Sequence, residues 1–97
     1  MNIGTEAARC DDYDILNNKY ELQYKVKGDT IFDSNYYPIY RIRDGKVYDA
    51  GTLEVKGIIK DNKIMDRKYY PKYMIKKNKI VDYQYRQKYI IKKKGGD

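Results

Sequence analysis

The stretch YMIKKNKIVD, residues Tyr73–Asp82, decides the fold because its two apolar halves flank a central pair of turn residues, KN. Two short runs rich in β-branched residues, joined by two residues that include an asparagine, are typical of a tight β-hairpin. Side chains alternate across a strand, so Ile75 and Ile80 share one face of this hairpin, while Met74 and Val81 share the other. The stretch therefore predicts a two-stranded hairpin that is apolar on both faces.

The same unit recurs along the chain at a nearly constant interval. Units start at residues 24, 40, 57, 73 and 89, which are 16 or 17 residues apart. The first four all have valine or isoleucine on both sides of a two-residue turn, a lysine or arginine directly before the turn, and a final aspartate. We therefore expect an all-β fold of repeated antiparallel β-hairpins with a period of about 16 residues, forming a meander or a curled single sheet.

A two-residue turn also fixes which residues face each other within a unit. In the first unit it places Val26 opposite Ile31 and Tyr24 opposite Asp33. The aspartate that ends each unit is interpreted as a hydrogen-bond acceptor where the strand exits, because a catalytic group would not need to recur with the fold. In architecture alone, the chain resembles Tyr-rich bacterial hairpin-repeat modules such as cell-wall-binding repeats.

Residues before the first unit do not show the repeat. We assign residues 1–19 to an N-terminal extension and residues 20–97 to the β-hairpin repeat domain. Within the extension, residues 5–16 are the one candidate for a helical turn, with Thr5 as its N-cap.

Composition argues against an enzyme. The 97 residues include no histidine and one cysteine, so no histidine general base, disulfide framework or paired-cysteine zinc site is expected. We expect no catalytic residues, no cofactor and no metal site. No apolar run is long enough for a membrane helix, and no secretory signal is evident. The chain favours a cytoplasmic location, with a processed exported protein as the alternative.

Positive charge accumulates towards the C-terminus. The whole chain has a formal net charge of +7, and residues 67–97 alone contribute +9. Tyrosines alternate with these cations, which is the pattern of a surface that attracts an acidic partner and offers aromatic contact area. The candidate binding surface consists of Tyr69, Tyr70, Lys72, Lys76, Lys77, Lys79, Tyr83, Tyr85, Arg86 and Lys88.

Three functions are compatible with this reading. The first is a non-enzymatic binding module that presents a Tyr- and Lys-rich sheet surface to an acidic protein or polymer. The second is a nucleic-acid-binding or phage-type inhibitor protein that uses the basic C-terminal half. The third is a structural repeat of a bacterial surface or envelope protein, in which hairpins that are apolar on both faces promote self-association. A solvated basic sheet with no partner would show the same lysine and tyrosine pattern.

Overall fold

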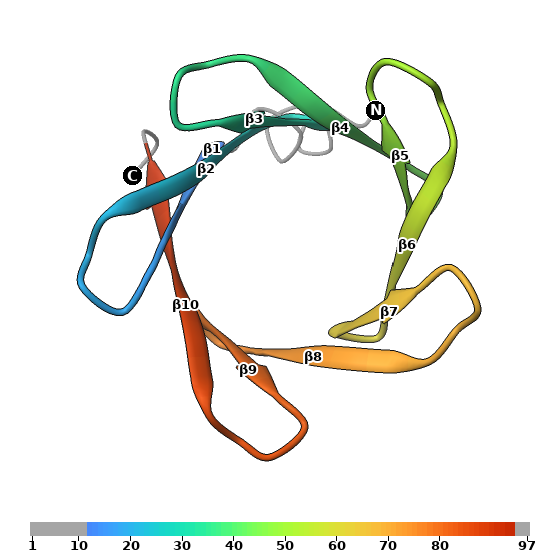
Figure 1. Cartoon of the computed structure of the whole chain (residues 1–97). Helices are drawn as coiled ribbons and strands as arrows, with labels where there is room; N and C mark the ends of the chain where they lie inside the picture. Colours follow the sequence, from blue (N-terminus) through green and yellow to red (C-terminus); the bar gives the residue numbers. More distant parts are fainter. Residues whose placement is uncertain (1–11, 95–97) are drawn as a thin grey trace, which may run out of the picture.

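The computed structural model describes residues 12–94 and folds them into ten strands. In chain order they are β1 (Asp12–Leu16), β2 (Leu22–Lys27), β3 (Thr30–Asp33), β4 (Pro38–Arg43), β5 (Lys46–Asp49), β6 (Val55–Lys60), β7 (Lys63–Asp66), β8 (Pro71–Lys76), β9 (Lys79–Asp82) and β10 (Gln87–Lys94). Each strand pairs antiparallel with the next, and β1 also pairs with β10, so the sheet closes into a barrel. Figure 1 shows this ring end-on. The predicted fold of consecutive antiparallel hairpins is confirmed, and its curled sheet is a closed one.

The tight turns behave as the repeat predicts. Val26 lies opposite Ile31 and Tyr24 opposite Asp33 in the first hairpin, β2–β3. The second, third and fourth hairpins are β4–β5, β6–β7 and β8–β9, and they repeat this register. Positive φ angles occur in all four turns, at Gly28 (60°), Asp44 (52°), Asp61 (54°) and Lys77 (57°). These tight turns lie at one end of the barrel, and the longer connections lie at the other end.

The N-terminal segment differs from our expectation. A helical turn over residues 5–16 is wrong for Asp12–Leu16, which form strand β1, and residues 5–11 lie outside the described residues. Because β1 pairs with both β2 and β10, it belongs to the barrel and not to an extension that ends at residue 19. The physical reason is the unpaired edge of β10, whose backbone groups need a partner. We call the β10–β1 pair the fifth hairpin, because it takes the place of a hairpin in the ring although its strands are the last and the first of the described chain.

Polar contacts hold this closure at both ends of the barrel. Asp14 on the outer face of β1 forms ion pairs with Lys25 of β2 (3.6 Å) and Lys94 of β10 (3.5 Å). At the other end, the side-chain amides of Asn18 and Gln87 are joined by a 2.9 Å hydrogen bond, and Asn18 Nδ2 donates to the Gln87 carbonyl at 2.8 Å. β1 is therefore fastened to both of its neighbours.

Aliphatic side chains line the inner face of the barrel. They are Ile15, Val26, Ile31, Ile42, Val47, Ile59, Ile64, Ile75, Ile80 and Ile91. Of these, Ile80 is buried and the others are half-buried. A ten-stranded barrel is wider than the eight-stranded barrels that side chains can just fill. The interior is therefore apolar without being closely packed.

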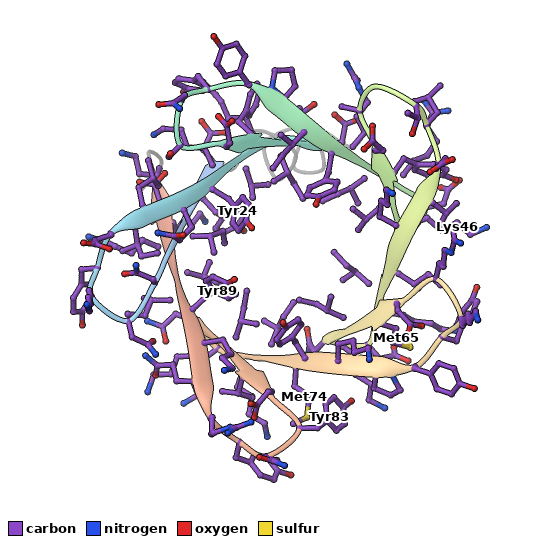
Figure 2. The ribbon with its side chains drawn as sticks, viewed as in Figure 1. Tyr24, Lys46, Met65, Met74, Tyr83 and Tyr89 are labelled. Carbon is purple, nitrogen blue, oxygen red and sulfur yellow. The ribbon has the colours of Figure 1, made fainter. Side chains whose placement is uncertain are left out.

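Tyrosines share the interior with the aliphatic residues. Tyr24 and Tyr89 point inward in Figure 2, and their ring centroids are 6.3 Å apart. Burial raises the pKa of the Tyr24 phenol, and the neighbouring phenols raise it further, in the order Tyr89, Tyr40 and Tyr73. Four of the five units thus place a tyrosine at the equivalent inward-facing position, at the same height in the barrel. The third unit has Gly57 at this position.

Most of the best-buried side chains lie on the outer face. Leu16, Ile58, Val81 and Ile90 are 5–9% exposed although they alternate with the inward-facing residues. The third and fourth hairpins are apolar on both faces, as predicted. The long connections project outward from the ring in Figure 1 and fold along this outer wall. The protein therefore has a second apolar layer between its wall and its own loops.

Candidate functional site

Each long connection is fixed by the side chain that ends the preceding strand. After β7, Asp66 Oδ1 accepts hydrogen bonds from the backbone N–H groups of Lys68 (2.8 Å) and Tyr70 (3.0 Å). The Asp66 carbonyl accepts a third from the N–H of Tyr69 (2.9 Å). The same three hydrogen bonds are made by Asn17, Asp33 and Asp82. Asn17 is therefore the aspartate position of the fifth hairpin.

The repeated aspartates are structural. Backbone N–H groups lower the pKa values of Asp49, Asp66 and Asp82 below the ordinary value. At Asp66 the largest cause is the hydrogen bond from Tyr70. The interpretation of these carboxylates as acceptors at strand exits is confirmed. Within residues 12–94, no group of three or more histidine, cysteine, aspartate or glutamate side chains is placed to hold a metal ion.

The connections expose one large side chain per hairpin in a left-handed backbone conformation. Four are tyrosines three residues after the capping side chain: Tyr20 (φ 63°), Tyr36 (71°), Tyr69 (70°) and Tyr85 (64°). Leu53 (65°) takes this place in the longer connection after Asp49. All five side chains are between 50% and 72% exposed. We call these four tyrosines the loop tyrosines.

The loop tyrosines lie against the outer wall beside cations. The Tyr36 ring meets the Phe32 ring edge-on at 5.3 Å between centroids, and the ammonium groups of Lys25 and Lys27 lie 5.2 and 5.6 Å from its centroid. In the fourth hairpin the ammonium of Lys76, the equivalent of Lys27, lies 5.5 Å from the centroid of Tyr85. Two hairpins thus repeat the same pairing of ring and cation.

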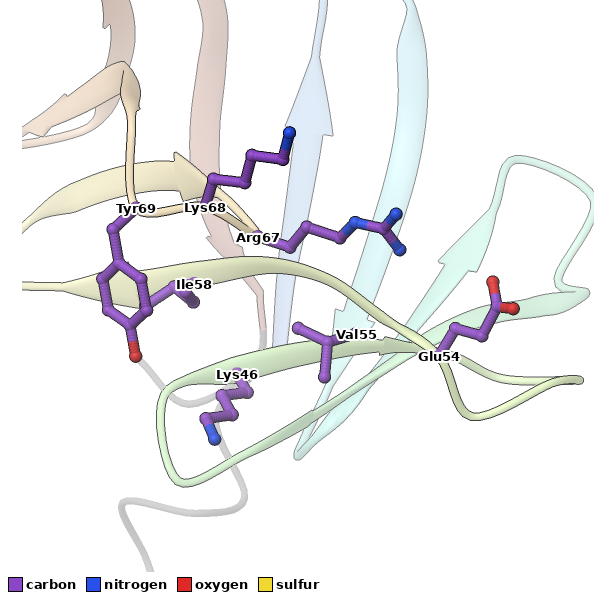
Figure 3. A pocket seen from close by; sticks show the side chains of 7 residues that line it. All are labelled: Lys46, Glu54, Val55, Ile58, Arg67, Lys68 and Tyr69. Atoms are coloured by element: carbon purple, nitrogen blue, oxygen red, sulfur yellow. The ribbon is translucent and has the colours of Figure 1, made fainter.

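A groove of about 480 Å³ opens on the outer wall between the second and third hairpins. Figure 3 shows its lining, with the Tyr69 ring beside Ile58. The groove is lined by Lys46, Glu54, Val55, Ile58, Arg67, Lys68 and Tyr69. Three cations and one carboxylate surround an apolar floor and one aromatic ring. This chemistry suits an anionic group attached to a flat apolar one.

The surface predicted from the sequence lies on the third, fourth and fifth hairpins. The connections after β7 and β9, and the starts of the strands that follow them, carry Tyr69, Tyr70, Lys72, Tyr83, Tyr85, Arg86 and Lys88. Lys76, Lys77 and Lys79 lie in and beside the tight turn of the fourth hairpin, and the ammonium of Lys76 reaches to 5.5 Å from the centroid of the Tyr85 ring. All ten side chains are exposed. Arg86 is already paired, because its Nε donates to Asp82 Oδ2 at 2.9 Å.

Several residues of this outer surface were missed by the sequence reading. The groove adds Lys46, Arg67 and Lys68, and the repeated backbone conformation adds Tyr20 and Tyr36. The sequence contains a signal for Lys46, because this residue begins the second strand of its unit in the same column as Lys63 and Lys79. The two tyrosines could have been found by aligning the connections as well as the hairpins.

Comparison with protein-family models, with curated proteins and with solved structures finds no match for this chain. Among residues 12–94, no helix has the length and apolar character to cross a membrane.

Proposed function

We propose that this protein is a non-enzymatic binding module that presents its outer Tyr- and Lys-rich surface to an acidic protein or polymer. The observation that carries the proposal is the set of loop tyrosines, which combine a strained backbone with exposed rings. The left-handed region costs a non-glycine residue about 1–2 kcal/mol, and glycine or asparagine avoids most of this cost. Strain that recurs at exposed positions is typical of functional surfaces.

Packing within the fold does not fully explain why these positions carry tyrosine. Tyr85 and Tyr20 leave 71% and 72% of their surface exposed, so much of each ring contributes no packing to the fold. A large residue with positive φ need not be aromatic in these connections, because Leu53 has a φ of 65° in the longer connection after Asp49. An aromatic ring with one side open to solvent offers contact area to a binding partner.

The charges around the rings favour an acidic partner. Among the described residues, Arg67, Lys68, Lys72 and Lys88 form no ion pair, and the two nearest strand-end carboxylates, Asp66 and Asp82, already accept backbone hydrogen bonds. Exposed cations without local partners attract a polyanion over about one Debye length, roughly 8 Å at physiological salt. The third function, a self-associating structural repeat, has less support because the closed ring leaves no strand edge for pairing.

The test is binding to a panel of polyanions. Poly-glutamate, a sulfated polysaccharide and a single-stranded oligonucleotide are titrated with the protein at about 50 and 200 mM salt, the range over which multivalent electrostatic binding weakens most visibly. We expect at least one to bind, with a loss of affinity of tenfold or more at the higher salt. The double variant Tyr69→Asn and Tyr85→Asn should weaken that binding, while Leu53→Asn, the matched loop change, should not. An absence of binding to all three at low salt would overturn the proposal.

A further inference from the structure

The outer wall carries cations on every hairpin, not only on the C-terminal pair. Residues that flank the tight turns are outward-facing and exposed. We call the following set the basic belt: Lys27, Arg43, Lys46, Lys60, Lys63, Lys76 and Lys79. On strands β2 to β9 no carboxylate shares this outward register. The outward carboxylates of the described strands, Asp12 and Asp14, lie on β1, whereas Asp29, Asp44 and Asp61 lie in the tight turns and Glu54 lines the groove. The belt therefore runs around most of the circumference.

Strands of neighbouring hairpins pair in a staggered register. As a result, the belt cation that begins the second strand of one hairpin lies opposite an apolar outer residue, here called a floor residue, in the first strand of the next hairpin. Lys46 is the register partner of Ile58, which lines the groove under Tyr69. The same stagger pairs Lys63 with Met74 and Lys79 with Ile90. Tyr85 follows Met74 in the fourth hairpin, and Tyr20, after β1, holds the equivalent place in the fifth hairpin. The groove is thus the first of three consecutive sets of cation, apolar floor and tyrosine.

Because these sets recur at a regular interval, they suit a polymer with a repeating chemical unit. Neighbouring hairpins are two strands apart, which corresponds to about 9.6 Å along the wall at 4.7–4.9 Å per strand. A ligand that engages all three sets needs one anionic and one flat apolar group in each repeating segment. Single-stranded nucleic acid has this composition, because phosphates alternate with bases that stack on tyrosine. An acidic protein segment supplies the charges but no regular series of flat rings.

We propose, resting on the function proposed above, that the acidic partner is single-stranded nucleic acid that follows the outer wall across the third, fourth and fifth hairpins. Belt lysines neutralise its phosphates, and the loop tyrosines stack on its bases. The wall is strongly convex, since the molecule measures only 39 × 30 × 28 Å. Double-stranded DNA has a persistence length of about 150 base pairs and keeps its base faces covered, so it fits this wall poorly.

The experiment measures affinity by fluorescence anisotropy with oligo(U) of increasing length, a duplex of matched length, poly-glutamate and heparin as probes. Oligo(U) should bind at least roughly tenfold more tightly than the other three probes at equal salt, because only it offers unpaired bases for stacking. Affinity should rise with oligonucleotide length until all three sets are covered and then level off.

Two double variants separate the roles of charge and ring. Lys46→Gln with Lys63→Gln should lower oligo(U) affinity and reduce the slope of log affinity against log salt by about 1.4, at roughly 0.7 per phosphate contact. Tyr69→Asn with Tyr85→Asn should lower affinity at least roughly tenfold and leave the salt slope unchanged. The charge-matched control, Lys27→Gln with Arg41→Gln, changes exposed cations of β2 and β4, which lie outside all three sets, and should change affinity less than threefold. Circular dichroism and the thermal midpoint verify that each variant is folded.

The outcomes distinguish this inference from the function on which it rests. If poly-glutamate, heparin or the duplex binds as tightly as oligo(U), the nucleic-acid inference is overturned and the acidic-partner proposal stands. If the tyrosine variant binds every probe like the unmodified protein, both proposals are overturned, because both rest on the loop tyrosines. If the belt variant behaves like its charge-matched control, the path along the wall is overturned. If no probe binds at low salt, both proposals fail.

Discussion

Closure of the barrel by β1 makes a strong prediction for Leu16. This side chain is 8% exposed on the outer wall, where it is the register partner of Ile90, itself 9% exposed. Leu16→Ala removes most of a buried side chain and leaves a cavity, which typically costs 2–5 kcal/mol. Because Leu16 lies on the outer wall and retains 8% of its exposure, we expect a loss at the lower end of this range, about 2–3 kcal/mol, from the free energy of unfolding. For a domain of this size the thermal midpoint should fall by roughly 10–20 °C.

Leu53→Ala is the matched control for Leu16→Ala. The chemical change is identical, but Leu53 is 65% exposed in the connection between β5 and β6, so its loss should cost less than about 0.5 kcal/mol. Urea denaturation followed by far-ultraviolet circular dichroism measures both, and the m-value should stay constant if the unfolded chain is the same. If the two variants lose equal and small amounts of stability, β1 does not form the tenth strand and the reasoning is wrong.

Further predictions concern the third hairpin, the strand-end carboxylates and the strained loops. Gly57→Ala should destabilise the fold by about 1–3 kcal/mol, because the new Cβ would lie 2.9 Å from the Met65 carbonyl oxygen; urea denaturation should show a smaller effect for Gly51→Ala, whose nearest atom is a side-chain oxygen at 3.3 Å. The folded-state pKa values of Asp49, Asp66 and Asp82 are lowered, so their contribution to stability is present above the unfolded value of about 3.9 and is lost as the pH falls through the folded values. Stability should thus change little from pH 7 to 5 and fall below about pH 4; replacing all three with asparagine should flatten this acid decline, and an unchanged decline would contradict the assignment. Tyr69→Asn should change the free energy of unfolding by less than about 1 kcal/mol, since relief of the left-handed strain offsets the lost ring contacts; a loss above 2 kcal/mol would show that the ring is retained for folding.

The hairpins could be predicted because their determinants are local. A two-residue turn with residues that accept positive φ fixes the register, and the alternation of Val26 and Ile31 with their neighbours assigns the faces. The long connections carry a weaker signal in the sequence. Pro38 and Pro71 begin β4 and β8, yet the connections after Asn17 and Asp82, which contain no proline, adopt the same hydrogen-bonded conformation. A capping side-chain oxygen of asparagine or aspartate, and not the proline, is common to these four connections.

Two features could not be read from the sequence. Strand β1 carries half a repeat unit, with Asn17 in the aspartate column and no turn before it, so its partner becomes identifiable only when the ring closes on β10. The left-handed tyrosines contradict the ordinary preference of that backbone region for glycine and asparagine. In both cases a long-range or loop-specific requirement overrides the local preference of the residues.

Counting charge along the chain also gives a misleading location for the basic surface. Residues 1–33 have a formal charge of −3, but Asp14 is occupied by Lys25 and Lys94, and Asp33 accepts two backbone hydrogen bonds. The cations of the second and third hairpins, among them Arg43 and Lys60, project from the wall without such partners in the described residues. Because belt cations face outward on the second, third and fourth hairpins, the positive surface charge is not confined to the C-terminal third. An acidic ligand should therefore sense a band around the barrel, and its affinity should respond to Lys46 and Lys63 as strongly as to the lysines of the C-terminal third.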